Sequence, residues 1–161
     1  MQIRSPHKVS DESGAAIVEF ALMLPFVCLI FFAIIDFGRA FNYWVDTTHL
    51  ASEGARLAAV DKVPAGSGGL QAYIRSKADT AELRDGGTSW IDSPLEVCVN
   101  PGPGDAVGDP IEVTVTTTYN LLPVDSLPIP GLKDIPANVQ IHGSATMRRE
   151  ALATNVSPGC G

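Results

Sequence analysis

The first half of the chain carries its hydrophobic residues in one long block. Residues 15–35 contain a single charge, Glu19, and a single residue that disturbs helices, Pro25. About 20 consecutive apolar residues are enough for a helix to cross the hydrocarbon core of a bilayer. We therefore predict a transmembrane helix over residues 15–35.

Beyond this block, apolar and small side chains recur every three to four residues, as they do on one face of a helix. They are Phe37, Phe41, Trp44, Val45, Thr48, Ala51, Ala55, Ala58 and Ala59. The helix is expected to continue as an exported amphipathic segment over residues 36–62, unbroken from about residue 15 to residue 60. Such a helix is about 69 Å long, more than twice the hydrocarbon thickness. Its small residues, Gly54 among them, would let another element lie close against it.

The second half of the chain changes to other patterns. Pro64 and the run AGSGG end the long helix, and residues 70–83 predict one short helix. Residues 95–99, 111–119 and 139–147 then alternate apolar and polar positions, which is typical of strands. Strands with one apolar face form a sheet that is covered on one side only. We predict an α+β exported head over residues 63–161, whose small antiparallel sheet packs on the long helix.

Charge and motifs exclude several classes of function. Eighteen acidic and eleven basic residues give a net charge of -7, so we expect no nucleic-acid partner. The chain contains no catalytic constellation and no nucleotide-binding motif, so we expect neither an enzyme nor a cofactor. Asp105 and Asp109 lie in a proline-rich loop without the spacing of a calcium-binding EF-hand. Solvated loop acids are the preferred interpretation, and no metal is predicted.

The flanking charges and the cysteines bear on location. Arg4 and Lys8 precede the apolar block, so the positive-inside rule places residues 1–14 in the cytoplasm and the head outside. A cleaved secretory signal fits poorly, because the apolar block is longer than the usual signal core. If the head is exported, Cys98 and Cys160 are candidates for a disulfide, which depends on whether the fold brings the two sulfurs together.

Three sequence blocks resemble a known family. Gly14, followed after four residues by Glu19 and Phe20, resembles the G-x4-E-[FY] junction of type IV prepilins. The block GAAIVEFALMLPF that contains it, with IDFGRAF at residues 35–41 and SEGARLAA at residues 52–59, is similar to TadE-like minor pilins. These proteins, also called pseudopilins, belong to tight-adherence (Flp) pilus systems. The ending GSATMRRE, residues 143–150, is more loosely similar to the last strand of that family.

The resemblance implies a pilin-like fold and a defined maturation. Residues 1–14 would be a leader, which a prepilin peptidase removes by cutting between Gly14 and Ala15. Glu19 would then neutralise the freed α-amino group of Ala15, in its own or a neighbouring subunit, and so hold subunits in register. The implied partners are the peptidase, other pilins, pilus assembly platform proteins and membrane lipid. The implied location is the bacterial cytoplasmic membrane, with the pilus at the cell surface as the destination.

Alternatives remain for several of these residues. Glu19 can snorkel to the membrane interface, and Pro25 can kink the helix without any role in assembly. Asp36 and Arg39 are three residues apart at the membrane exit and can pair along one helical face, at an interface boundary or against a partner subunit. The whole chain can also be an unprocessed single-pass anchor whose exported head binds a ligand or an envelope polymer.

Overall fold

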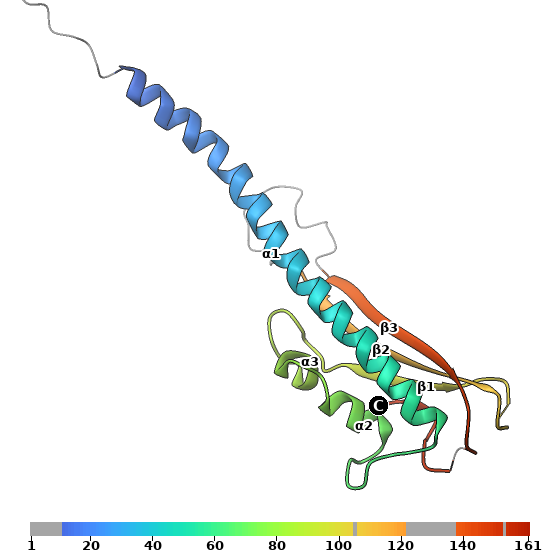
Figure 1. The fold of residues 1–161 in the computed structure, drawn as a ribbon. Helices are drawn as coiled ribbons and strands as arrows, with labels where there is room; N and C mark the ends of the chain where they lie inside the picture. The colour runs from blue at the N-terminus through green and yellow to red at the C-terminus, as the bar shows by residue number, and fades with distance from the viewer. Residues whose placement is uncertain (1–10, 105, 122–137, 153) are drawn as a thin grey trace, which may run out of the picture. The chain divides into compact units, whose positions relative to one another are not determined.

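The computed structural model describes residues 11–104, 106–121, 138–152 and 154–161. The chain divides into two compact units, Met1–Phe37 and Gly38–Gly161. One helix, α1 (Asp11–Ala59), begins in the first unit and continues into the second, which holds all the other elements (Figure 1). The unit Gly38–Gly161 is called the head below.

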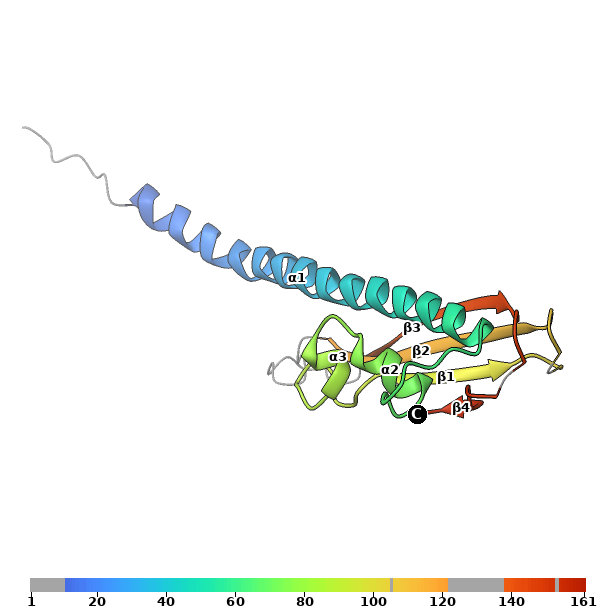
Figure 2. The ribbon, with the colours of Figure 1, turned by 60° about the horizontal axis from the view of Figure 1, so that its bottom comes forward.

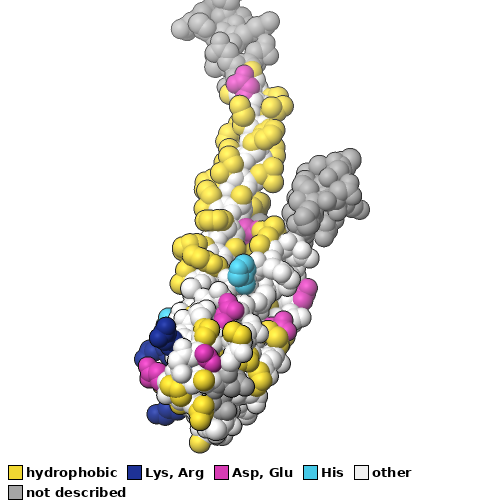
Figure 3. Space-filling view, turned by 90° about the vertical axis from the view of Figure 1, so that its right-hand side faces the viewer, with side chains coloured by type: hydrophobic (Ala, Val, Ile, Leu, Met, Phe, Trp, Pro, Cys, Tyr) yellow, Lys and Arg dark blue, Asp and Glu magenta, His cyan; other side chains and the backbone are white. Residues whose placement is uncertain are grey.

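The helix α1 confirms the predicted long, unbroken helix. It contains 49 residues and continues through Pro25. Its large apolar side chains between Ile17 and Ile35 are 45–69% exposed. The space-filling view shows hydrophobic side chains along this part of the helix (Figure 3). With a mean hydropathy of 2.6 in its most apolar window, α1 is long and apolar enough to cross a membrane.

The head contains a small antiparallel sheet, as the alternating segments predicted. Its strands are β1 (Glu96–Pro101), β2 (Pro110–Asn120), β3 (Asn138–Arg148) and β4 (Gly159–Cys160), in the order β3-β2-β1-β4. The register of β2 and β3 is continuous, from Pro110 opposite Arg148 to Asn120 opposite Asn138. The short strand β4 was not predicted, because two residues cannot show an alternating pattern.

The head part of α1 covers one face of this sheet (Figure 2). A Cβ atom on Gly143 of β3 would lie 2.5 Å from the backbone nitrogen of Thr48, so α1 and β3 touch through their backbones there. A Cβ atom on Gly54 would lie 3.0 Å from the Val113 side chain of β2. At the end of α1, the Ala59 carbonyl accepts a hydrogen bond of 2.7 Å from the N–H of Glu150, just beyond β3. The head part of α1 therefore runs in the same direction as β3.

The face that α1 turns to the sheet differs in part from the predicted one. The small residues are buried as expected, and Ala51 and Ala55 have no exposed surface. The aromatic and β-branched residues placed on the same face are 48–71% exposed instead; they are Phe37, Phe41, Trp44 and Val45. Tyr43, Thr47 and Leu50 are buried in their place. The backbone contact at Gly143 accounts for the difference, because it brings the Thr47–Thr48 side of α1 against β3 and leaves Phe41 and Trp44 on the other side.

The predicted single helix over residues 70–83 is wrong, since the structure has two. They are α2 (Leu70–Ser76), which packs against β1, and α3 (Ala81–Asp85). Thr80 starts α3 as its N-cap, with Oγ1 accepting a hydrogen bond of 3.3 Å from the N–H of Leu83. The N–H of Asp79 donates to Asp46 Oδ2 of α1 at 3.1 Å. The linking residues are thus used in a cap and in a contact with α1, so the fold is α+β with two short helices.

Candidate processing and assembly site

The residues of the predicted processing junction lie on the first turns of α1. Gly14, Ala15, Glu19 and Phe20 are all helical and exposed, with Phe20 at 67%. Side chains of a helix lean towards its N-terminus, so the Glu19 side chain points back along the helix towards Ala15. A positive charge at Ala15 could therefore reach the Glu19 carboxylate without distortion of the helix.

Arg39 takes part in a row of aromatic contacts in the head. Its guanidinium lies 4.5 Å from the centroid of the Trp90 ring. Trp90 stacks on Tyr119 of β2 at 6.2 Å, and Tyr119 lies 5.5 Å from the ring of Tyr43 on α1. Cation–π contacts of this kind contribute about 0.5–1 kcal/mol. Asp36 is 7% exposed, and its pairing with Arg39 stays a prediction.

Two acidic residues connect α1 to the segment around α3. The Tyr43 hydroxyl donates a hydrogen bond to the Glu82 carboxylate of α3. Burial, the hydrogen bond and the Glu82 charge together raise the pKa of Tyr43 to about 12. Burial also raises the pKa of Asp46, which accepts the hydrogen bond from the Asp79 N–H. Sequence reasoning missed both links; Asp46, an acidic residue on the packed face of α1, was the only signal.

Asp61, just beyond the end of α1, binds the C-terminal segment. It is 9% exposed and has a positive φ of 50°, which Asp tolerates better than most residues. Its carboxylate accepts hydrogen bonds from the backbone N–H groups of Thr154, Asn155 and Val156, at 2.9, 2.9 and 3.0 Å. Burial by itself would raise the pKa of Asp61, but a hydrogen bond from the Thr154 hydroxyl and these backbone hydrogen bonds outweigh it and hold the pKa well below its usual range.

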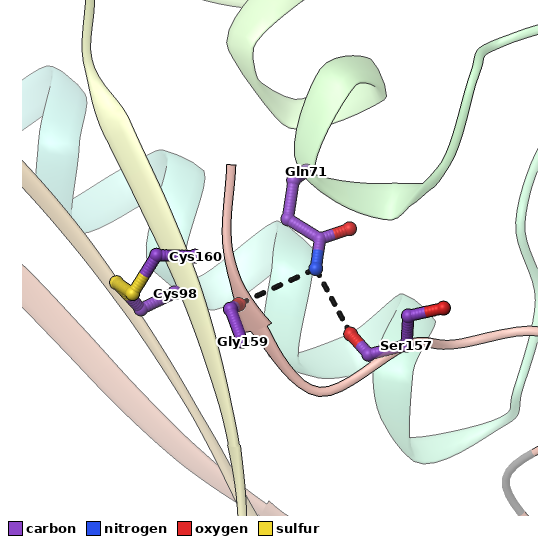
Figure 4. Close-up of a disulfide and its surroundings, with 5 residues drawn as sticks. All are labelled: Gln71, Cys98, Ser157, Gly159 and Cys160. Atoms are coloured by element: carbon purple, nitrogen blue, oxygen red, sulfur yellow. Dashed lines mark hydrogen bonds between the residues drawn. A yellow bond between two sulfur atoms is a disulfide. The ribbon is translucent and has the colours of Figure 1, made fainter.

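A disulfide joins the edge strand β4 to its neighbour β1. Cys98 of β1 lies directly opposite Cys160 of β4, and the two sulfurs are bonded (Figure 4). Gln71 of α2 supports the same segment, since its side-chain amide donates to the carbonyls of Ser157 and Gly159 at 2.9 and 3.4 Å. Cys28 is the free cysteine of the described residues.

Two groups of side chains among the described residues bear on metal binding. The carboxylate of Glu96 and the two disulfide sulfurs lie within 4.8 Å of one another, but bonded sulfurs are not the thiolates that metals bind. Asp109 uses its carboxylate within its own loop, where it accepts a hydrogen bond of 3.0 Å from the N–H of Ala106. Asp105 and most of the proline-rich segment at residues 121–136 lie outside the described residues.

The architecture is pilin-like: a long, apolar N-terminal helix continues into a head with a small antiparallel sheet. Residues 14–56 match the family model described as TadE-like protein. The match confirms the resemblance of this stretch to TadE-like proteins of tight-adherence pilus systems, and it covers both the apolar block and the first part of the head. No curated protein and no solved structure matches the chain.

Proposed function

We propose that this chain is a minor pilin of a tight-adherence pilus, held in the bacterial cytoplasmic membrane before it is assembled. The observation that carries the proposal is the TadE-like match over residues 14–56, on a helix long and apolar enough to cross a membrane. In this proposal residues 1–14 face the cytoplasm, the head is exported, and the role is structural rather than catalytic.

The disulfide supports export of the head. Disulfides form and persist in oxidising compartments, and are rare in the reducing cytosol of most bacteria. Cys98 and Cys160 are bonded in the head, whereas Cys28 lies in the apolar block. A cytosolic location would expose this bond to reduction, and an exported head preserves it.

The proposed maturation gives Glu19 its partner. Cleavage between Gly14 and Ala15 creates an α-amino group, which is positively charged below its usual pKa of about 8. A carboxylate or an ammonium that is left unpaired in a low-dielectric environment is unfavourable by several kcal/mol. Glu19 can pair with the amine of its own chain or of a neighbouring pilin, so that correct alignment is favoured over other registers. The partners in this step are the prepilin peptidase, other pilins and the assembly platform.

The cleavage is tested on protein purified from its native host. Intact-mass measurement and N-terminal sequencing should show a mature chain that begins with Ala15. Retention of residues 1–14 in cells with an active prepilin peptidase would contradict the proposal and favour the unprocessed membrane-anchored binding module.

The role of Glu19 is tested by substitution. Glu19→Ala should still be inserted and cleaved, but its amount in sheared pili should fall at least about tenfold, which corresponds to about 1.4 kcal/mol of lost alignment energy. Glu19→Gln, which keeps the size but not the charge, should behave in the same way. Glu12→Ala, an acid on the other side of the cut, is the matched control and should assemble normally. Normal assembly of Glu19→Gln would show that the carboxylate only snorkels to the interface.

A further inference from the structure

Three side chains with metal-binding atoms meet where β1 is joined to β4. Cys98 and Cys160 lie directly opposite each other in the two strands (Figure 4). Side chains of a strand alternate between the two faces of a sheet, so Glu96, two residues before Cys98, lies on the same face. The Glu96 carboxylate and the two sulfurs lie within 4.8 Å of one another. One carboxylate and two cysteine sulfurs therefore converge at this edge of the sheet.

The register of the strands explains why the two cysteines are so close. Val97 and Gly161 exchange two hydrogen bonds of 3.1 Å, so they form a hydrogen-bonded pair of the ladder. The next pair along, Cys98 with Cys160, is therefore a non-hydrogen-bonded pair, the kind in which opposing side chains come closest. Gln71 of α2 adds its hydrogen bonds to the same segment. The backbone thus favours this arrangement of the two sulfurs whenever β4 is in place.

The three side chains are open to solvent. Glu96 and Cys160 are exposed and Cys98 is half-buried, whereas Val97 and Val99, on the other face of β1, are buried in the core. A metal ion and a reductant can therefore reach the sulfurs. Exposed disulfides are also reduced more readily than buried ones. Every newly made chain begins with both cysteines as thiols, because the cytosol keeps thiols reduced.

Two thiolates and a carboxylate are a ligand set for zinc. Zn²⁺ binds cysteine sulfur at about 2.3 Å and carboxylate oxygen at about 2.0–2.2 Å in a tetrahedral arrangement, and water often fills a fourth position. Ligand atoms of such a tetrahedron lie about 3.5–3.8 Å apart, so rotation of the cysteine side chains must separate the sulfurs after reduction. These distances are within the 4.8 Å that the three atoms span. Ca²⁺ and Mg²⁺ prefer oxygen ligands, so the two sulfurs disfavour them.

We propose that, when Cys98 and Cys160 are thiols, they and Glu96 bind a Zn²⁺ ion that holds β4 in place of the disulfide. Zinc binding converts both thiols to thiolates and releases their protons to solvent. Disulfide formation uses the same two sulfurs, so the ion and the disulfide are alternative ties for one strand. In the newly made chain the ion closes this edge of the sheet before the disulfide forms. The proposal concerns the head alone and does not rest on the pilus function.

The zinc site is tested with the full chain in detergent micelles. Cys28→Ala is the reference in every sample, so that Cys98 and Cys160 are the only cysteines. A trialkylphosphine reduces the disulfide to two thiols and becomes the phosphine oxide with oxygen from water; it is then removed under nitrogen. The probe is Co²⁺, which reports a tetrahedral thiolate site through its spectrum. The reduced chain should show a thiolate-to-cobalt charge-transfer band that Zn²⁺ abolishes, and the oxidised chain should show none.

Four variants identify the ligands. Loss of a residue that only supports a ligand lowers metal affinity about 10–100-fold, so Cys98→Ser and Cys160→Ser should each lower the affinity for Zn²⁺ at least about a hundredfold. Glu96→Gln keeps the size but removes the charge, and should lower the affinity at least about tenfold. Glu112→Gln is the matched control, because Glu112 lies on the same face of β2 but opposite Asn100. It should bind zinc as the reference does.

Amide exchange shows whether the ion holds the strand. The N–H of Val97 donates to Gly161 beside β4, so its exchange rate reports the pairing of β1 with β4. Measured by NMR, this exchange should be slow in the oxidised chain and fast after reduction. Saturating Zn²⁺ should slow it again in the reduced chain at least about tenfold. In Cys98→Ser it should stay fast with and without zinc.

Three outcomes would overturn the zinc site. These are no charge-transfer band in the reduced chain, unchanged zinc affinity in Glu96→Gln, or zinc binding that leaves the Val97 amide in fast exchange. None of them concerns cleavage between Gly14 and Ala15, so the zinc site can fail while the minor pilin proposal stands. Retention of residues 1–14 in the native host would instead remove the pilus role and leave the zinc site intact.

Discussion

Gly143 is the residue on which the contact between α1 and the sheet depends most directly. The atoms that a Cβ would meet there are the Thr48 nitrogen at 2.5 Å and the Thr47 carbonyl carbon and oxygen at 2.6 Å. These are backbone atoms of a helix, which cannot rotate away as the end of a side chain can. Any larger residue must therefore push α1 off β3.

For this reason we expect Gly143→Ala to lower the free energy of unfolding of the head by about 3 kcal/mol. Urea unfolding of the full chain in detergent micelles, followed by tryptophan fluorescence, measures the change. Gly38→Ala is the control. Gly38 lies on α1, and a Cβ atom there would meet nothing within 4 Å. That variant should be as stable as the natural chain or slightly more stable. Equal stability of the two variants would contradict the close contact.

Asp61 is the second residue with a specific electrostatic role. Asp61→Asn removes the charge that three backbone N–H groups stabilise, and its amide can turn a donor towards them. Hydrogen bonds to charged groups contribute about 1.5–3 kcal/mol, so we expect a loss of about 2–3 kcal/mol near pH 7. The exposed Asp92→Asn is the control and should change little.

The contribution of Asp61 should depend on pH in a defined direction. The pKa of Asp61 is lower in the folded state than the usual value of about 3.9 in the unfolded state. The carboxylate therefore stabilises the head fully above about pH 4, and this stabilisation is lost as the pH falls through the lower folded pKa. The difference in free energy of unfolding between the natural chain and Asp61→Asn should stay constant from pH 7 to about pH 4 and narrow as the pH falls further. A difference that stays constant at lower pH as well would show that the charge is not responsible.

At the scale of elements, β4 depends on contacts outside itself. A strand of two residues has too few ladder hydrogen bonds to stay in place alone. The disulfide ties it to β1 across a sequence separation of 62 residues, and Gln71 adds two hydrogen bonds. A loop of this length restricts the unfolded chain enough to stabilise a fold by about 4 kcal/mol in the chain-entropy account.

Replacement of both Cys98 and Cys160 by Ala should therefore lower the free energy of unfolding by about 2–4 kcal/mol. It should also release β4 from the sheet, which loss of amide protection at Val97 would report. Cys28→Ala is the matched control, because this cysteine is free. A reductant should reproduce the effect in the natural chain and leave the double variant unchanged. Identical urea midpoints with and without reductant would contradict a stabilising role.

Elements with a long repeating pattern were predictable, and those that depend on distant contacts were not. The apolar block and its continuation, in which apolar residues recur every three to four positions, indicated α1. The alternation of apolar and polar residues indicated the three long strands. The break at residues 77–80 depends on Asp46, more than 30 residues away, which no local pattern shows. The outward orientation of Phe41 and Trp44 has a similar cause. Their spacing suits either face of α1, and Gly143 of β3 decides which face packs.

The functional residues divide in the same way, into those that a local pattern predicts and those that depend on distant contacts. Gly14, Ala15, Glu19 and Phe20 were identified through a resemblance within one continuous stretch, and the match over residues 14–56 covers them. Asp61 was missed because its partners are 93 to 95 residues further along the chain.

At the scale of the whole molecule, one helix has two different surroundings. Its large apolar side chains up to Ile35 are exposed, as a membrane-spanning segment requires. From Tyr43 to Ala59 the same helix supplies part of the head core, with Leu50, Ala51 and Ala55 fully or almost fully buried. The head therefore includes the second part of α1, and only the segment before about Gly38 can be removed without loss of core residues. A soluble fragment that keeps the sheet must also keep α1 from about Gly38.

The close fit at Gly143 has a consequence for biogenesis. The chain leaves the ribosome from its N-terminus, so in the proposed topology α1 is synthesised and exported long before the strand that accommodates it. During that interval its alanine-rich face has no sheet to cover it, and a chaperone or protease in the envelope can recognise it. Arrival of β3 ends this exposure, so the most vulnerable moment of the protein should fall between export of the helix and export of that strand.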